Sequence, residues 1–481
     1  MGQAVVVGSG PNGLAAAVLM ARAGFEVDVY EAADTLGGGA RTAESTLPGF
    51  HHDVCSGAHP MGLASPFFRA FDLAAHGVEM LVPEASYAHP LDGGRAGIAW
   101  KDLARTADGL GADGPGWLRL FEPLVRRWGG VVELAMSDKR RLPQDLLTAT
   151  RMATRAVEQG GPWWNRRFRD EVAPAMFTGV AGHAIRPLPT FAPAGAALLL
   201  ATLAHAVGWP VPKGGSQAIA DALVADLRAH GGRTHTGHRV QSLSEFPTGA
   251  TILLDIAPAE FLRIAGAELP ARYQRVLRRF RYGGAAAKVD FALRGPVPWQ
   301  APGCDRAGTL HVVGTRAQAA DAEAAVAAGR HAERPYVLAI QPGVVDPSRA
   351  PEGAHTFYTY AHVPNGSTVD VGDAVAAQME RFAPGFSDLV LARNVVTAEQ
   401  LSQHNRNYVG GDISAGAMSL WQTVMRPGPR WNPFATPLPG VFLCSSATPP
   451  GPGVHGMCGV HAVRHALRES GIRTDPLTLF T

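Results

Sequence analysis

Hydrophobic and polar residues follow one another along this chain in blocks that predict alternating strands and helices. At the N-terminus, QAVVVG predicts a buried strand, PNGLAAAVLMARAG a helix that ends at Gly24, and FEVDVYE a second strand. Residues 3–31 therefore predict one complete β-α-β unit.

Two later regions have the same character. Within residues 211–256, VPKGGSQAIADALVADLRAHGG predicts a loop and a helix, while RTHTGHRVQSL and ATILLDIAP each predict a strand. In the last fifty residues, GVFLCSSA predicts a strand, TPPGPGVHG a loop and MCGVHAVRHALRESG a helix. We expect an α/β fold in which a Rossmann-like nucleotide-binding domain, made of residues 1–75, 206–284 and 430–481, is interleaved with a mixed α/β substrate domain, made of residues 76–205 and 285–429.

Composition narrows the class of protein. A chain of 481 residues, 46% hydrophobic and 17% charged, predicts two or three globular domains. The net charge of +2 gives no support for a nucleic-acid partner. Four cysteines without paired spacing favour reduced thiols and a cytoplasmic setting. No signal peptide is expected at the N-terminus, and residues 191–209 predict a buried helix because Pro193 and His205 interrupt them. Peripheral contact with a membrane stays open.

The first glycine motif, VVVGSGPNGLAAAV, has the G-x-G-x-x-G spacing of a dinucleotide site. Gly8 permits a tight turn, Gly10 lets the backbone approach a pyrophosphate, and Gly13 lets helix and strand pack closely. The helix that starts here directs its free N–H groups at the phosphates. Its first residues, Pro11 and Asn12, are expected to contact the cofactor. Glu31, followed by Ala32, ends the second strand, where a carboxylate binds ribose hydroxyls. The alternative is a glycine-rich turn of an unrelated α/β fold.

A second G-x-G-x-x-G pattern occurs at Gly451, Gly453 and Gly456. A second dinucleotide fold needs a further strand after its helix, ending in an acid. Only DPLTLFT follows HALRESGIRT, and its Asp475 precedes the apolar residues. We therefore expect both glycine patterns to serve one cofactor.

The stretch EAADTLGGGART, residues 31–42, resembles the GG motif of the phytoene desaturase and flavin amine oxidase superfamily. NYVGGDISAGAMS and DPSRAPEG are similar to its branch of phytoene dehydrogenase-related proteins. The resemblance implies FAD as cofactor, with its pyrophosphate against Gly38, Gly39, Ala40 and Arg41. It also implies an adenine contact at Val240 and a C-terminal flavin loop that includes Ser446, Gly453, Val454, His455 and Gly456. Many FAD enzymes have an acidic residue in this loop that binds the ribityl chain, whereas this sequence has Ser445 and Ser446 at that place.

Catalytic candidates are fewer. The resemblance implies that Lys288 in AAAKVDFALRGPVPW holds water near the flavin and that Ser56 and His59 lie beside it. His59 is expected as a general base with a pKa near neutrality, or as a histidine satisfied by backbone hydrogen bonds. The alternative is that Lys288 is a solvated lysine on a strand and has no functional role. Tyr358 and Tyr360 are candidates for a pocket wall or for the core. We expect no metal site, because no Cys-x-x-Cys or H-E-x-x-H motif frames the histidines.

These features predict an FAD-dependent oxidoreductase, a desaturase or oxidase that transfers hydride from a C–H bond of an apolar or amphipathic small molecule to the flavin. O2 or a quinone is expected as the electron acceptor. Disulfide chemistry is excluded because no C-x-x-C pair occurs. Two alternatives stay open: a non-catalytic FAD-binding interaction or assembly protein, and a carotenoid or isoprenoid desaturase or ketolase at a membrane surface.

Overall fold

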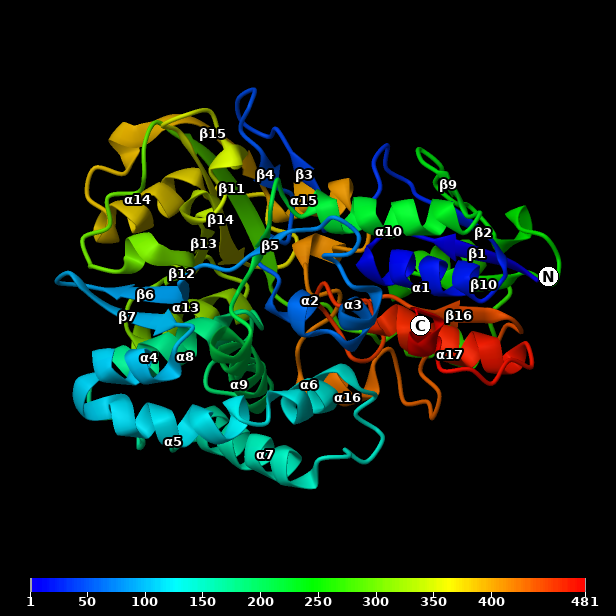
Figure 1. The fold of residues 1–481 in the computed structure, drawn as a ribbon, viewed down its shortest axis with the longest axis horizontal. Coiled ribbons are helices and arrows are strands. Elements are labelled where there is room, and N and C mark those ends of the chain that lie inside the picture. Colours follow the sequence, from blue (N-terminus) through cyan, green and yellow to red (C-terminus); the bar gives the residue numbers. More distant parts are fainter. Residues whose placement is uncertain (1, 481) are drawn as a thin grey trace.

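A parallel five-stranded sheet forms the first structural unit of the chain. A computed structural model describes residues 2–480, and Figure 1 shows the two termini close to this sheet. Its order, from one edge to the other, is β16 (Val441–Leu443), β10 (Thr251–Leu254), β1 (Gln3–Val7), β2 (Glu26–Tyr30) and β9 (Arg233–His235). All five strands were expected from the sequence. The predicted strand after Gly232 ends earlier than expected, at His235, because Gly237 turns the chain with a positive φ of 65°.

Helices cover both faces of this sheet. On one face α1 (Pro11–Arg22) packs against both α10 (Gln217–Ala229) and α17 (Met457–Glu469) (Figure 1). On the other face α11 (Pro258–Ala265) and α12 (Ala271–Arg278) bury Val5, Val7 and Leu254. No strand follows α17 in the described residues, where the short turn η8 (Pro476–Phe480) ends the chain. The single Rossmann-like layer predicted from the sequence is confirmed.

The second unit is a mixed seven-stranded sheet. Its order is β15 (Val390–Val396), β11 (Ala285–Leu293), β14 (His355–Val363), β13 (Val337–Ile340), β12 (Ala307–Val312), β6 (Ala85–Leu91) and β7 (Arg95–Trp100). Neighbouring strands are antiparallel except β12 and β6, which are parallel. The fold is therefore the α/β arrangement expected, although the exact domain bounds stay a prediction.

The two faces of this mixed sheet differ in chemistry. One face carries apolar side chains, such as Val289, Phe291 and Phe357, that pack with α14 (Gly372–Phe382). Because side chains alternate along a strand, the other face carries the residues between them. They include polar and aromatic side chains as well as the aliphatic Ala286, Leu338 and Ile340.

Helices fill the space beside the second sheet. They are α4 (Leu103–Gly109), α5 (Gly114–Val125), α6 (Trp128–Met136), α7 (Leu146–Gly160), α8 (Val172–Gly182), α9 (Phe191–Ala206), α13 (Arg316–Ala327), α15 (Ala398–His404) and α16 (Leu420–Met425). The apolar helix α9 packs against α5, α7 and α8 as a buried helix. Within residues 2–480, every helix is too short or too polar to cross a bilayer.

Short elements connect the two units. The hairpin β3 (Thr42–Ala43) and β4 (His52–Asp53) follows the first β-α-β unit, and the helices α2 (Pro60–Ala64) and α3 (Pro66–Phe71) come next. The strands β5 (Met80–Leu81) and β8 (Val211–Pro212) pair where the chain passes into and out of the helical segment. The chain thus crosses between the units several times.

Candidate active site

One cavity of about 1220 Å³ extends from the glycine loop after β1 to the helices α7, α9 and α16. Three segments far apart in the sequence contribute to its first half: the loop before α1, the turn before Arg41 and the loop before α17. Its second half is lined by helical residues and by β12, β13 and β14 of the mixed sheet. The geometry places a nucleotide-type loop and an apolar chamber in one continuous space.

The glycine loop packs tightly on Asp255, which follows β10. Gly8 has a positive φ of 96°, and a Cβ on Gly10 would lie 2.6 Å from the Asp255 Oδ2 atom. The Gly13 amide donates a hydrogen bond to the same oxygen at 2.9 Å. Gly8 and Gly10 line the cavity, whereas Gly13 lies behind it. Asp255 also lines the cavity, and sequence reasoning missed it, although its place at the end of a predicted strand was a usable signal.

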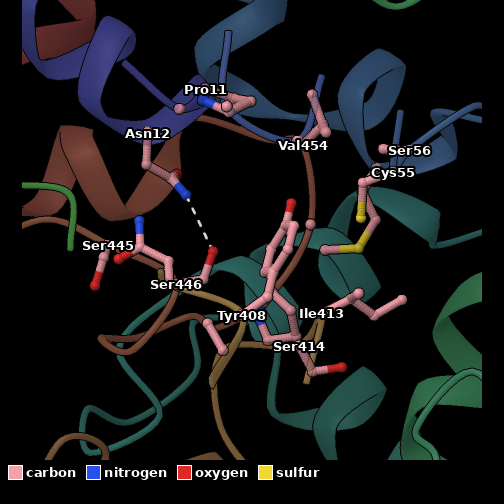
Figure 2. A pocket seen from close by; sticks show the side chains of 18 of the residues that line it. Pro11, Asn12, Cys55, Ser56, Tyr408, Ile413, Ser414, Ser445, Ser446 and Val454 are labelled. Carbon is pink, nitrogen blue, oxygen red and sulfur yellow. Dashed lines mark hydrogen bonds between the residues drawn. The ribbon is translucent and has the colours of Figure 1, made fainter. Parts of the chain in front are cut away.

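Pro11 and Asn12 begin α1 at the cavity wall. The Asn12 amide nitrogen donates to Ser446 Oγ at 3.4 Å, as Figure 2 shows, whereas the buried Asn12 Oδ1 has no hydrogen-bond partner. The first N–H groups of a helix favour an anion. This corner of the cavity therefore fits a phosphate group.

Glu31 stands at the end of β2 and lines the cavity together with Ala32. Its carboxylate accepts hydrogen bonds from the Ser9 amide at 2.9 Å, the Ser9 hydroxyl at 2.6 Å and the Ala33 amide at 2.9 Å. It thereby holds the glycine loop to the second strand. Val240 lines the cavity close by, and its carbonyl accepts from Arg263 at 2.7 Å.

The GG turn, residues 38–41, places one positively charged side chain, that of Arg41, at the cavity. Gly38, Gly39, Ala40 and Arg41 all line the cavity. The Arg41 side chain is buried and donates to the Gly38 carbonyl at 2.8 Å and to Thr35 Oγ1 at 2.9 Å. No carboxylate within residues 2–480 pairs with it. A buried, unpaired guanidinium is costly unless an anion compensates it, so the residues present fit a dinucleotide with a pyrophosphate.

The C-terminal loop reaches the same cavity through Ser446, Gly453 and Val454. His455 and Gly456, which were expected to bind the cofactor, do not line it and instead form the start of α17. His455 Nδ1 accepts from the Met457 amide at 3.0 Å, and Gly456 is the N-cap with a φ of 70°. The helix begins within the range that the sequence predicted.

Ser56 and His59 line the cavity beside the GG turn. His59 Nε2 contacts Ser216 Oγ at 2.8 Å, and that hydroxyl donates to the Ser56 carbonyl at 2.5 Å. Burial lowers the pKa of His59 to about 4, so the expected pKa near neutrality is wrong and the imidazole is neutral at pH 7. Its Nδ1 has no partner.

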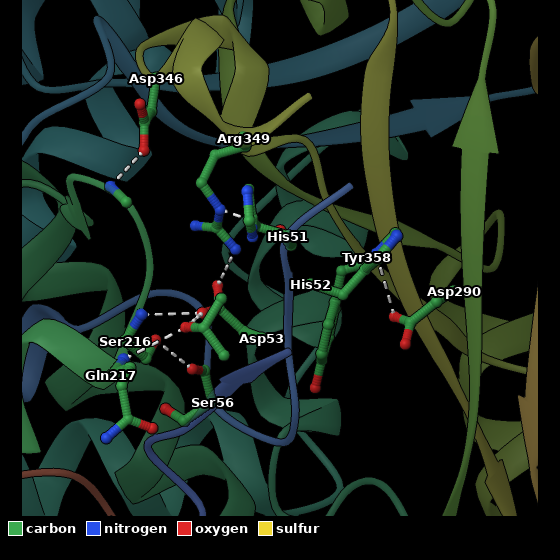
Figure 3. A network of polar contacts seen from close by, with 12 residues as sticks. His51, His52, Asp53, Ser56, Ser216, Gln217, Asp290, Asp346, Arg349 and Tyr358 are labelled. Carbon is green, nitrogen blue, oxygen red and sulfur yellow. Dashed lines mark hydrogen bonds and ion pairs between the residues drawn. The ribbon is translucent and has the colours of Figure 1, made fainter. Parts of the chain in front are cut away.

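A buried polar network holds this loop in place. Figure 3 shows that the Arg349 guanidinium points at Asp53, and the two form an ion pair at 3.0 Å. Asp53 also accepts from the Ser216 amide at 2.8 Å and from Thr42 Oγ1 at 2.9 Å. The network therefore positions Ser216, whose hydroxyl contacts His59 and the Ser56 carbonyl.

Lys288 is not among the residues that line the cavity. Its buried ammonium pairs with Asp290 and lies 4.6 Å from the centre of the Tyr358 ring. Tyr358 itself lines the cavity, as does Tyr360. The alternative of a solvated strand lysine is thus wrong, and a catalytic role for Lys288 stays a prediction.

Tyr408 and Cys55 also line the cavity near Gly39, and Tyr408 was missed from the sequence (Figure 2). The Tyr358 hydroxyl donates to the Cys55 carbonyl at 2.5 Å, which ties the loop to the mixed sheet. Burial raises the pKa of the Cys55 thiol. Within the described residues no cluster of three histidine, cysteine or acidic side chains has the arrangement of a metal site.

Similarity to known proteins agrees with this geometry. Residues 6–75 match the family model described as an NAD(P)-binding Rossmann-like domain. The chain is 25% identical to the rat "Pyridine nucleotide-disulfide oxidoreductase domain-containing protein 2", over 97% of this chain and 93% of that protein. It is also 25% identical to a phytoene desaturase (neurosporene-forming) of Rhodobacter capsulatus, over 95% and 92%.

Solved structures extend the likeness to the fold. A putrescine oxidase bound to putrescine superposes with a TM-score of 0.59 at 17% identity, over 98% of both chains. At that identity the likeness concerns the fold. The arrangement of a dinucleotide sheet and a mixed sheet is therefore shared with oxidoreductases.

Proposed function

We propose that this chain is an FAD-dependent oxidoreductase that removes hydride from a C–H bond of an apolar or amphipathic small molecule; the neighbouring carbon or nitrogen loses a proton to solvent, and a C=C or C=N bond forms. The observation that carries the proposal is the single cavity, in which the glycine loop, the GG turn and the C-terminal loop meet an apolar chamber. The relatives named as a phytoene desaturase and a putrescine oxidase support the class of reaction.

FAD suits this cavity better than a nicotinamide dinucleotide alone. The GG turn adds a second contact to the pyrophosphate region, and the C-terminal loop extends the lining to Val454. When bound, FAD supplies a two-electron acceptor for substrate hydride, and the electrons then pass to O2 or a quinone. The residues of the chain would hold it: Gly10 and Arg41 at the phosphates, Glu31 at the ribose, and Ser446 and Val454 toward the flavin end.

The residues on the substrate side of the cavity offer a hydrogen bond and exclude water. Neutral His59 offers Nδ1 as a hydrogen-bond acceptor, because its Nε2–H donates to the Ser216 hydroxyl, whose own proton goes to the Ser56 carbonyl. Tyr358 and Tyr360 close the chamber toward the mixed sheet, which excludes water from the site of hydride removal. Because no charged general base lines this part, the chain's own contribution is orientation and exclusion of water.

Anaerobic titration tests the proposal. The purified protein should carry FAD, and its visible absorbance should bleach with one class among amines, amino acids and isoprenoids. Gly10→Val and Glu31→Ala should each lose bound flavin, whereas Gly129→Ala should keep it, because a Cβ at Gly129 meets no atom within 4 Å. Full flavin occupancy in both site variants would overturn the cofactor site, and an FAD-loaded protein that no substrate reduces would support the non-catalytic alternative.

One observation favours a second candidate, an isoprenoid desaturase or ketolase at a membrane surface. Leu420 lines the cavity and is 60% exposed, and its neighbour Trp421 is 61% exposed. Exposed apolar residues at a cavity mouth suit entry of a lipid-like substrate. Sedimentation with phosphatidylcholine vesicles should recover the wild type and lose Trp421→Ser if this candidate is correct. Recovery of neither protein would reject it.

A further inference from the structure

The sheet side of the cavity carries polar groups without partners. Thr309 and His311 on β12 share a face with Tyr358 and Tyr360 on β14, because paired positions across β13 keep the same side. Tyr87 on β6 is paired with Thr309 and belongs to the same face. We call Tyr87, Thr309 and His311, together with His183, the polar cluster.

Three atoms of the polar cluster are buried and lack hydrogen bonds: Tyr87 Oη, Thr309 Oγ1 and His311 Nδ1. Of these three residues only Thr309 lines the cavity, and it is 1% exposed, whereas Tyr87 and His311 do not line it. His183 also lines the cavity, and its Nε2 contacts His311 Nε2 at 2.9 Å. Buried polar groups are normally satisfied, so an unpartnered hydroxyl at a cavity wall indicates a polar ligand group.

The charges near the polar cluster restrict which polar group of a ligand can bind there. Burial lowers the pKa of His183 to about 3 and that of His311 well below its usual range, so both are neutral. The carboxylates that line the cavity belong to the Rossmann-like unit: Glu31 follows β2, Asp255 follows β10 and Glu260 lies in α11. An ammonium group at the polar cluster would therefore meet no compensating charge.

Two lysines strengthen this restriction. Lys288 on β11, the strand next to β14, already neutralises Asp290. Lys139, which lines the helical part of the chamber, donates to the carbonyls of Ala135 at 3.0 Å and Pro450 at 3.3 Å and has no carboxylate partner in the described residues. Its positive charge adds to the cost of a cationic ligand.

Helices α7 and α9 give the chamber an apolar wall. Helix α7 contributes Met152, Ala153 and Ala156, and α9 contributes Ala196 and Leu199. Such a wall accommodates a hydrocarbon chain. Since the polar cluster stands at the sheet end and the hydrocarbon wall at the helical end, the chamber is amphipathic.

We infer that this chamber binds an amphipathic substrate by an uncharged hydroxyl or carbonyl group, which the polar cluster holds, and that it discriminates against alkylammonium ions. This inference rests on the proposed function, since it names the substrate class of the same site. It sets the chain apart from an enzyme that takes cationic amines.

Calorimetric titration of the purified holoprotein with 1-octanol, 2-octanone, n-octylamine and octanoate at pH 7.5 tests the inference without requiring turnover. We expect 1-octanol and 2-octanone to bind and n-octylamine to bind at least about tenfold more weakly. Thr309→Val should weaken 1-octanol about fivefold, the loss of one neutral hydrogen bond. Tyr360→Phe provides a second variant at the same face if Thr309→Val lowers the melting temperature.

Thr202→Val is the matched control, because Thr202 is buried with an unpartnered hydroxyl but does not line the cavity. It should leave the affinity for 1-octanol unchanged. Equal or tighter binding of n-octylamine would overturn the inference, as would an unchanged affinity in both Thr309→Val and Tyr360→Phe. Tightest binding of octanoate, lost in Lys139→Met, would place the polar group at the other end and also overturn it. Absence of FAD or of flavin reduction would count against the proposed function only.

Discussion

The hydroxyl oxygen of Tyr408 occupies the space that a Cβ on Gly39 would need. The next nearest atoms to that position are Tyr408 Cζ at 3.5 Å and Cys55 Cβ at 3.6 Å, which are ordinary contacts. Any other residue at position 39 would therefore place its Cβ against the Tyr408 hydroxyl oxygen. The backbone itself does not require glycine there, because Gly39 has no left-handed φ. The turn and the loop of Tyr408 fit together as a pair.

A rescue experiment follows from this pairing. Gly39→Ala should lose most of the bound flavin, because the tyrosine hydroxyl must move into the cavity. Gly39→Ala/Tyr408→Phe should regain it, since removal of the hydroxyl leaves only ordinary contacts around the new methyl group. Flavin-to-protein absorbance ratios of the purified variants measure this. Equal loss in the single and double variants would show that something other than the hydroxyl requires glycine.

The buried ion pair of Asp53 and Arg349 should matter for stability. Arg349 is 1% exposed, and its replacement by methionine leaves the Asp53 carboxylate buried without its cation. We expect Arg349→Met to lower the free energy of unfolding by about 3–5 kcal/mol. Urea denaturation measures this, with Arg233→Met as control, because its pair with Asp28 is largely exposed and contributes at most about 1 kcal/mol.

The double variant Asp53→Asn/Arg349→Met separates charge from packing. It should recover part of the loss, because the asparagine oxygen still accepts from the Ser216 amide. A double variant as unstable as Arg349→Met would instead attribute the loss to the packing of the arginine side chain.

Asp255 should make stability fall as pH rises. Burial raises its pKa to about 7, so between pH 4 and 7 the folded chain holds a proton that the unfolded chain has released. The contribution of this group to the free energy of unfolding therefore decreases over that range. Asp255→Asn removes the ionisation, and its stability relative to wild type should rise by on the order of 2–4 kcal/mol from pH 4 to pH 8. A difference that does not change with pH, measured by urea denaturation, would contradict this.

Lys288 can be tested apart from its ion pair. Lys288→Met leaves Asp290 buried beside His52, 3.6 Å away, and should be destabilising by about 3–5 kcal/mol. Lys288→Met/Asp290→Asn should recover most of that stability. Stopped-flow reduction of the flavin in this stable double variant then tests the predicted role: a rate at least about tenfold below wild type supports a contribution of Lys288 to the chemistry, and a wild-type rate contradicts it.

Features that depend on neighbours along the chain could be predicted from the sequence. The G-x-G-x-x-G turn and Glu31 belong to one β-α-β unit, whose spacing is set by the strand and helix lengths themselves. The strands β1, β10 and β16 were found for the same reason, since each is a short apolar run. Even the start of α17 followed from local signals.

Features that depend on contacts between distant segments could not be predicted. Asp255, Tyr408 and Thr309 each come from a different segment and meet the cavity only through the tertiary fold. Lys288 was expected on a strand and lies on one, but its pairing with Asp290, two residues away on the same face, was not predicted. The pKa of His59 depends on burial, which no local pattern reveals.

The order of the parallel sheet has a consequence for synthesis of the protein. The first β-α-β unit leaves the ribosome early, but its helix α1 packs against α17, and the edge strand β16 pairs with β10. Until residues 441–469 have been translated, one side of α1 stays uncovered and the Ser446–Val454 part of the cavity does not exist. Retention of the cofactor would then report that residues 441–469 have been translated, and chains that terminate before them would expose apolar surface that chaperones and proteases recognise.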